Sequence, residues 1–384
     1  MKSDNVHEVF SYPVERSTNE PSYLIDYLGY YDKVMPLLRL SSLASPFIKT
    51  GYSSCDKNFA FLTTKYSLII EGLDSNTILL FGKPQEFPFA VRNNISFYPV
   101  YDFLPELLSL FKDDPQLASS RAIKLIDKVV ESLMYLNPAY QVFWNDSLFL
   151  ERFLIFCGRR AGVRSICIQH GLFHDTFDCK FLDGYYADYM FVWSKSQAEL
   201  YCDPEFDKDK LRVMGYPYKV ENLAGTANNK RICLLGENIE TTNKDLGLRK
   251  KHVYEEIAKL LSRDEFELVY KLHPFEKDSK YIPANVKKVN ISLRRAFEEY
   301  EIFIALSTTA LLEATLHGKV AIQYLDTAIN GTDFQEKGYS YSTRKMDDIP
   351  VLVQELSEPL RVPESVILIP DDPSSKFLEV VGEL

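Results

Sequence analysis

The chain has 384 residues, 46% of them hydrophobic and 26% charged, which is typical of a globular protein too long for one ordinary core. Its formal net charge of −10 argues against nucleic acid as a partner, because phosphate backbones are bound by clustered lysine and arginine. No stretch approaches the roughly 18 apolar residues of a transmembrane helix, so we expect none.

The cysteines and the start of the chain point to a cytoplasmic protein. The six cysteines are scattered without a CxxC pair, and Cys157 and Cys167 lie in apolar segments, as reduced core residues do. Residues 1–20 are polar and lack the apolar core of a signal peptide. Peripheral contact with the inner face of a membrane stays compatible with this expectation.

After the polar lead, the first half of the chain predicts strands and helices. The segments are a strand over 77–82, helical spacing over 102–136, a strand over 140–144, a helix up to about 160, and strands over 165–168, 189–193 and 211–214. Residues 219–230 are polar and have no apolar period, so we interpret them as an interdomain linker.

The same alternation restarts after the linker. The segments are strands over 231–235, 266–272, 286–291, 301–306 and 320–325, helices over 247–262, 293–300 and 310–317, and a last helix near 375–381. Such alternation favours a parallel sheet with helices on both faces. We predict an α/β protein with two doubly wound, Rossmann-like domains that face each other across a cleft. Their expected bounds are 1–218 and 231–345, and a tail over 346–384 is free to pack back on the first domain.

A histidine at a predicted strand end is the first candidate functional residue. Gln169-His170-Gly171 follows the strand over 165–168, and glycine permits a sharp turn that leaves the imidazole projecting. Ligands of open α/β sheets bind beyond the carboxyl ends of the strands. A histidine with a pKa near neutrality can take a proton from an attacking hydroxyl, so we predict His170 as a general base.

The residues after this turn leave alternatives open. Asp175, Asp178 and Asp183 could orient His170 or replace it as the base, or they could be ordinary loop and capping residues. His174 stands four residues after His170, but no HExxH motif is present and Gly171 interrupts a helix. We therefore predict no metal site.

The second candidate is His273-Pro274, which ends another predicted strand. Proline keeps the preceding residue extended, so the imidazole of His273 is aimed at the carboxyl edge of the sheet, where it could donate to a phosphate oxygen. Lys271 would add positive charge on the same face if the strand stays regular. A solvent-facing histidine before an ordinary loop proline explains the motif equally well.

The third candidate is Ser307-Thr308-Thr309, between a buried strand and a helix. Hydroxyls and free backbone N–H groups at a helix start favour an anion such as a nucleotide phosphate, although an ordinary N-cap has the same residues. Glu313, one turn into the helix, could accept hydrogen bonds from ribose hydroxyls. Gly236 and Glu237 follow the first strand of the second domain and complete the predicted donor-binding set. The chain has no GxGxxG motif, no P-loop and no GxSxG motif.

The order of these motifs resembles that of bacterial surface-polysaccharide transferases. The runs Val142-Phe143-Trp144-Asn145 and Ser165 to Gly171 look like those of capsule-polysaccharide transferases. The order His-Gly, His-Pro, then Ser/Thr before a helix with Glu-Ala is similar to CDP-glycerol glycerophosphotransferases. It is also similar to bacterial sialyltransferases and polysialyltransferases of the GT-B type, with two Rossmann domains. The resemblance covers roughly residues 140–325.

This resemblance implies roles for the matching residues. His170 stands at the general-base position, where the sialyltransferases have an acidic pair before glycine and the glycerophosphotransferases have histidine. His273 matches the histidine that contacts the donor phosphate, Ser307 and Thr308 match the pair that binds the same phosphate, and Glu313 matches an acid near the ribose. The first domain would then bind the acceptor and the second the nucleotide donor. Gln169-His170 in place of two acids leaves a CDP-polyol donor open.

We therefore expect an inverting, metal-independent glycosyltransferase of capsule or lipopolysaccharide synthesis. It would move a CMP-activated ulosonic acid, such as sialic acid or Kdo, to a hydroxyl of a glycan or glycolipid acceptor, with no cofactor besides the nucleotide-sugar substrate. The alternatives are a CDP-glycerol-type polyol-phosphate transferase, a sugar-nucleotide epimerase, and a non-catalytic carbohydrate-binding protein.

Overall fold

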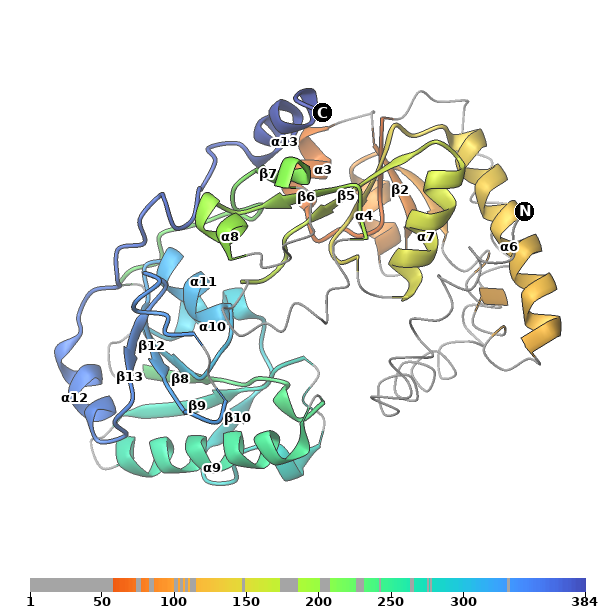
Figure 1. Cartoon of the computed structure of the whole chain (residues 1–384). Coiled ribbons are helices and arrows are strands. Elements are labelled where there is room, and N and C mark those ends of the chain that lie inside the picture. Colours follow the sequence, from red (N-terminus) through yellow and green to blue (C-terminus); the bar gives the residue numbers. More distant parts are fainter. Residues whose placement is uncertain are drawn as a thin grey trace.

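Two parallel β-sheets, one in each half of the chain, organise the structure (Figure 1). The computed structural model describes residues 58–384 apart from fifteen short gaps. The gaps are 74–76, 83–85, 100–102, 104–105, 108–109, 111–114, 147–148, 173–185, 201–207, 226–230, 242, 263–265, 275, 277 and 330–331. The predicted α/β class with two doubly wound units is confirmed.

The first sheet has the strand order β3-β2-β1-β4-β5-β6-β7, and neighbouring strands pair in parallel. Its strands are β1 (Phe59–Phe61), β2 (Thr77–Gly82), β3 (Ser96–Pro99), β4 (Tyr140–Phe143), β5 (Arg164–Ile168), β6 (Tyr189–Val192) and β7 (Leu211–Val213). Its helices are α3 (Ser67–Gly72), α4 (Phe87–Arg92), α6 (Pro115–Leu136), α7 (Phe149–Arg160), α8 (Lys195–Glu199) and the 3-10 turn Lys208–Lys210. In the part that the structure describes, the helical spacing predicted over 102–136 becomes a long helix only from Pro115.

The second sheet has the order β10-β9-β8-β11-β12-β13, again with parallel pairs. Its strands are β8 (Arg231–Leu235), β9 (Glu267–Lys271), β10 (Lys287–Val289), β11 (Ile302–Ala305), β12 (Val320–Tyr324) and β13 (Tyr341–Thr343). The helices of this unit are α9 (Lys244–Leu261), α10 (Leu293–Glu299), α11 (Ala310–Leu316) and α12 (Asp348–Glu355), with 3-10 turns at Ile239–Thr241 and Ser279–Tyr281. The last helix in the chain is α13 (Pro373–Gly382).

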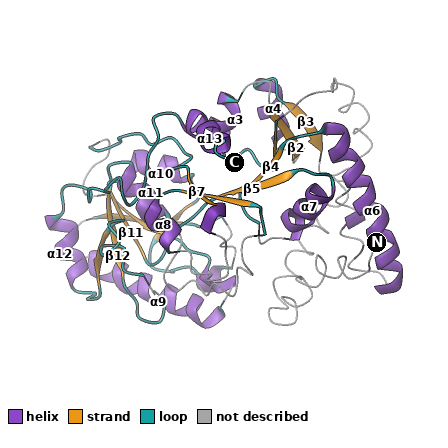
Figure 2. Ribbon diagram, turned by 45° about the horizontal axis from the view of Figure 1, so that its top comes forward, coloured by secondary structure: helices purple, strands orange, loops and turns teal. Residues whose placement is uncertain are grey.

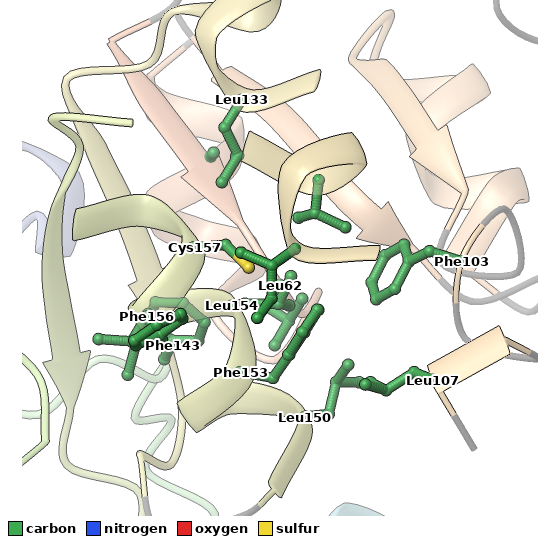
Figure 3. Close-up of a cluster of buried hydrophobic side chains, with 14 of the residues drawn as sticks. Leu62, Phe103, Leu107, Leu133, Phe143, Leu150, Phe153, Leu154, Phe156 and Cys157 are labelled. Atoms are coloured by element: carbon green, nitrogen blue, oxygen red, sulfur yellow. The ribbon is translucent and has the colours of Figure 1, made fainter. Parts of the chain in front are cut away.

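Apolar side chains cover both faces of each sheet, as buried parallel strands require. On one face of the first sheet, helices α6 and α7 pack through the cluster shown in Figure 3, which includes Phe143, Phe153 and Leu154. Cys157 and Cys167 belong to the same cluster and are free thiols. In the second sheet α9 starts at an Asn243 cap and presents a buried apolar face to the strands.

The end of the chain returns to the first sheet. Helix α13 lies beside α3 in both views, although β13 and α12 before it belong to the second unit (Figures 1 and 2). The Phe377 ring packs against the rings of Phe59, Phe61 and Phe191 at centroid distances of 5.2 to 6.1 Å. Residues 373–382 therefore contribute to the core of the first sheet.

Two crossings connect the units. The first runs through 214–225, which has neither helix nor strand, and it continues into 226–230, outside the described residues. The second runs from α12 to α13 through 356–372. Where the two crossings meet, the backbone N–H of Tyr216 donates to the carbonyl oxygen of Leu368 at 2.7 Å. Gly215 has φ of +93°, and a Cβ there would lie 2.9 Å from that oxygen, so glycine permits the close approach.

None of the helices that the structure describes is long and apolar enough to cross a membrane.

We predict that Phe377→Ala destabilises the first unit by about 3–5 kcal/mol, because it leaves a cavity among three aromatic rings. Leu378→Ala on the same helix is the matched control, since the Leu378 side chain is 46% exposed. Urea unfolding of both variants measures the difference. Equal losses would show that α13 is not part of the core.

Candidate functional site

The strand orders predict where a ligand would bind in each unit. The order reverses between β1 and β4 in the first sheet and between β8 and β11 in the second. Ligands of doubly wound folds bind beyond the carboxyl ends of the strands at such switch points. The predicted site residues follow β5, β8, β9 and β11, so they lie at the carboxyl edges of the two sheets.

A cavity of about 250 Å³ lies between the two units at these edges. Its walls come from the end of β5, the first crossing, α10 and α11. The lining residues are His170, Tyr216, Tyr218, Lys219, Glu221, Leu293, Arg294, Phe297, Glu313 and His317. Two predicted site residues, His170 and Glu313, therefore face one cavity from opposite units.

Gln169 fixes the turn that presents His170. The Gln169 side chain is fully buried, accepts from the backbone N–H of Trp193 at 2.9 Å, and donates to Gly171 O at 2.8 Å and to the Gln197 side chain at 2.6 Å. With its neighbour held inside, His170 projects outward and is exposed. The edge of the imidazole packs on Trp144, with the ring centroids 4.9 Å apart.

The surroundings of His170 keep its imidazole neutral. Burial by the surrounding protein lowers the pKa of His170 from 6.5 to about 4, and the nearby charge of Lys65 adds to the lowering. His170 nevertheless has an exposed surface, so contact with solvent reduces the lowering of its pKa. With or without this reduction, the neutral imidazole is the main form at pH 7 and can accept a proton.

Glu313 faces the same cavity, and its pKa is shifted upward rather than downward. Its carboxyl is partly buried, and burial raises its pKa from 4.5 to about 7, while the charge of Lys271 opposes the rise. Near neutral pH both its acid and its carboxylate form are populated. The cavity thus contains His170 as a base and Glu313 as a group able to give or take a proton.

Several polar groups of the loop before α11, which the sequence predicts to be available to a ligand, are hydrogen-bonded within the protein. The hydroxyl of Thr309 accepts a hydrogen bond from the backbone N–H of Leu172 at 3.1 Å, which ties the two units together. The Thr308 hydroxyl accepts from Ala310 N at 3.3 Å. The backbone N–H of Ser307 donates to a carboxylate oxygen of Glu237 at 2.9 Å, so this N–H group, predicted as free for an anion, is occupied by the protein itself.

Glu237 bridges the switch point between β8 and β11. One of its carboxylate oxygens accepts from the N–H groups of Leu306 and Ser307, at 2.7 and 2.9 Å, and from the hydroxyl of Tyr254 at 3.3 Å. Burial raises the pKa of Glu237 to about 7, although the two N–H bonds oppose the rise. The geometry makes Glu237 a residue that holds the loop after β11 against the loop after β8.

His273, Pro274 and Lys271 lie at the end of β9 and do not line the interdomain cavity. Burial lowers the pKa of both His273 and Lys271. Lys271 interacts electrostatically with Glu313 and with His273, so it connects the cavity to the β9 loop. Gly236 packs closely here: an added Cβ would lie 2.8 Å from the carbonyl oxygen of Lys271.

No group of three or more His, Cys, Asp or Glu side chains among the described residues could hold a metal ion. His174 and the alternative acids Asp175, Asp178 and Asp183 lie in 173–185, outside those residues.

Sequence reasoning missed several residues of the site. His317 lines the cavity four residues after Glu313, on the same helical face, and this spacing could have revealed it. Lys219 and Arg294 line the cavity too, and each pairs with Glu221, at 2.6 and 2.9 Å. No local signal distinguishes those two from ordinary surface cations.

Comparisons with known proteins bear on the fold. No family model and no curated protein matches the sequence. The UDP-GlcNAc 2-epimerase of Methanocaldococcus jannaschii superposes with a TM-score of 0.55 at 13% identity, covering 85% of this chain and 99% of that one. Its complex with UDP-GlcNAc and UDP gives 0.52 at 11%, with the same coverage. The enzyme of Rickettsia bellii gives 0.51 at 11%, covering 85% and 95%. The GT-B arrangement of two Rossmann-like domains is thereby confirmed.

We predict that Glu313→Gln changes how stability depends on pH. The folded pKa of about 7 lies above the ordinary 4.5, so Glu313 stabilises the fold most below pH 4.5 and loses this contribution as the pH rises through 7. The variant should therefore gain in Tm relative to the wild type from pH 4.5 to 8. Glu256→Gln, an exposed acid on α9, controls for the loss of one charge. A constant difference in Tm would contradict the raised pKa.

Proposed function

We propose that the protein is an enzyme acting on a nucleotide-activated sugar in the cavity between its two units. The observation that carries this proposal is the placement of His170 and Glu313 on opposite sides of that cavity. Their environments push the two pKa values apart, to about 4 for His170 and about 7 for Glu313, so that near neutral pH His170 can accept a proton and Glu313 can give or take one.

The second unit supplies a suitable place for the nucleotide. Its switch point between β8 and β11 is flanked by Gly236, Lys271, His273 and the Ser307-Thr308 loop, all at one sheet edge. A lysine and an imidazole beside the hydroxyl groups of Ser307 and Thr308 suit the phosphates of a nucleotide. The solved structures with this arrangement include one bound to UDP-GlcNAc and UDP, which supports a nucleotide sugar as the substrate class.

The reaction that we propose is glycosyl transfer with inversion. Neutral His170 takes the proton of an acceptor hydroxyl, and the hydroxyl oxygen attacks the anomeric carbon of the donor sugar. The bond from that carbon to the nucleotide phosphate breaks, and the electron pair leaves on the phosphate oxygen, which Lys271, His273 and Ser307 stabilise. The motif order favours a CMP-activated ulosonic acid as the donor and a glycan or glycolipid as the acceptor.

A sugar-nucleotide epimerase is the second candidate, and the structural comparisons favour it. All three solved structures compared above are described as UDP-GlcNAc 2-epimerases. An epimerase removes a proton from a sugar carbon and returns one to it, so it needs groups that exchange protons near pH 7. Glu313, with a pKa of about 7, has this property.

A nucleotide screen followed by product analysis tests these proposals. We expect CMP, CDP or UDP to raise the Tm, because a ligand of the folded state stabilises it by mass action. The matching nucleotide sugar is then incubated with and without a glycan acceptor. A transferase forms product only with the acceptor, whereas an epimerase converts the nucleotide sugar alone. A protein that binds none of the three nucleotides is not the enzyme that we propose.

We predict that His170→Ala lowers turnover by about 10²–10⁴-fold, the range expected when a general base is removed. Binding of the free nucleotide should persist, because His170 lies on the first unit. His252→Ala is the matched control, since His252 is an exposed histidine on α9 that does not line the cavity. Steady-state kinetics of both variants decide the point. Unchanged turnover in His170→Ala would remove this residue from the mechanism.

A further inference from the structure

A buried ionic cluster lies beside the loops that follow β8 and β9 in the second unit. Lys250 of α9 is fully buried, and its ammonium group lies 2.5 Å from a carboxylate oxygen of Glu276 and 2.8 Å from one of Glu240. It also donates to the backbone carbonyl oxygen of Glu237. One cation therefore contacts the loops that follow both β8 and β9.

Glu276 uses its two carboxylate oxygens for different partners. Oε1 accepts from Lys250 and, at 2.7 Å, from the hydroxyl of Tyr270. Oε2 accepts from the backbone N–H of His273 at 2.8 Å. The backbone N–H of Glu276 in turn donates to the carbonyl oxygen of His273 at 3.0 Å. Glu276 thus closes the turn after β9 and anchors it to α9.

Glu276 also restricts which residue can occupy position 236 in the loop after β8. A Cβ on Gly236 would lie 2.1 Å from Oε2 of Glu276, so the carboxylate fills the space that a side chain there would need. The loops after β8 and β9 therefore meet through this carboxylate. Stability alone is a weak explanation for such a cluster, because the cost of desolvating buried ions cancels much of their attraction.

We propose that Glu276 is a positioning residue for the donor phosphate. Held by Lys250 and Tyr270, it fixes the backbone of His273 and so directs the imidazole toward the crevice at the strand ends. The role rests on the proposed function, in which His273 stabilises the nucleotide phosphate.

Two substitutions separate positioning from charge balance. Glu276→Gln replaces one of the two acceptor oxygens by an NH₂ group. The amide keeps its oxygen toward the Lys250 cation, so its NH₂ group faces the His273 N–H and that hydrogen bond is lost. Glu240→Gln is the matched control, because Glu240 also contacts Lys250 and, like Glu276, acts electrostatically on His273, whereas the backbone N–H of His273 donates to Glu276. Both variants remove one negative charge from the surroundings of Lys250.

The experiment has two readouts in the full chain. Hydrogen exchange of the backbone amide of His273 should become about 10-fold faster in Glu276→Gln and stay unchanged in Glu240→Gln. The Kd of whichever of CMP, CDP or UDP binds the wild type should rise by about 10-fold in Glu276→Gln and less than about 2-fold in the control. If Glu276→Gln does not fold, Glu276→Asp replaces it, since it keeps the charge but is too short to reach both Lys250 and His273.

Each outcome decides between positioning and a purely structural role. Unchanged exchange at His273, or equal effects of the two glutamine variants on Kd, would overturn the proposal. Faster exchange with unchanged nucleotide affinity would overturn it too, because the loop would then move without consequence for the phosphate. His273→Ala should weaken binding at least as much as Glu276→Gln. If the wild type binds none of the three nucleotides, the proposed function itself fails, and the phosphate role of Glu276 fails with it.

Discussion

The second unit of this protein depends on carboxylates buried at the edge of its parallel sheet. Loops at the carboxyl ends of strands expose backbone N–H groups that no neighbouring strand satisfies, and buried N–H groups need acceptors. Glu237 supplies one for Leu306 and Ser307, and Glu276 supplies one for His273. These bonds hold the loops after β8, β9 and β11 against one another.

The cavity between the units depends on a different kind of contact. Thr309 of the second unit accepts from the backbone of Leu172 in the first, and Gln197 of the first unit donates to Tyr339 of the second at 2.7 Å. These bonds bring the end of β5 against the start of α11. As a result, His170 and Glu313 line one cavity although 142 residues lie between them in the sequence.

The sequence was sufficient for most of the elements and for part of the site, although helix α12 and strand β13 were not predicted. Strands such as β5 and β11 are short apolar runs buried along most of their length, and such runs bounded by turn signals are recognisable. His170 was predictable because a glycine and a strand end flank it. The occupied N–H of Ser307 was not, because its partner Glu237 is 70 residues away. The role of Glu276 was hidden for the same reason, since Lys250 joins it only in the folded sheet.

The return of the chain to the first sheet limits how the two units can move. A single flexible connection would let one unit rotate freely against the other. Here two segments of the chain cross between the units, and they are hydrogen-bonded to each other through Tyr216 and Leu368. Two crossings that are bonded to each other restrict this rotation. A movement of the units that separates His170 from Glu313 has to bend both crossings.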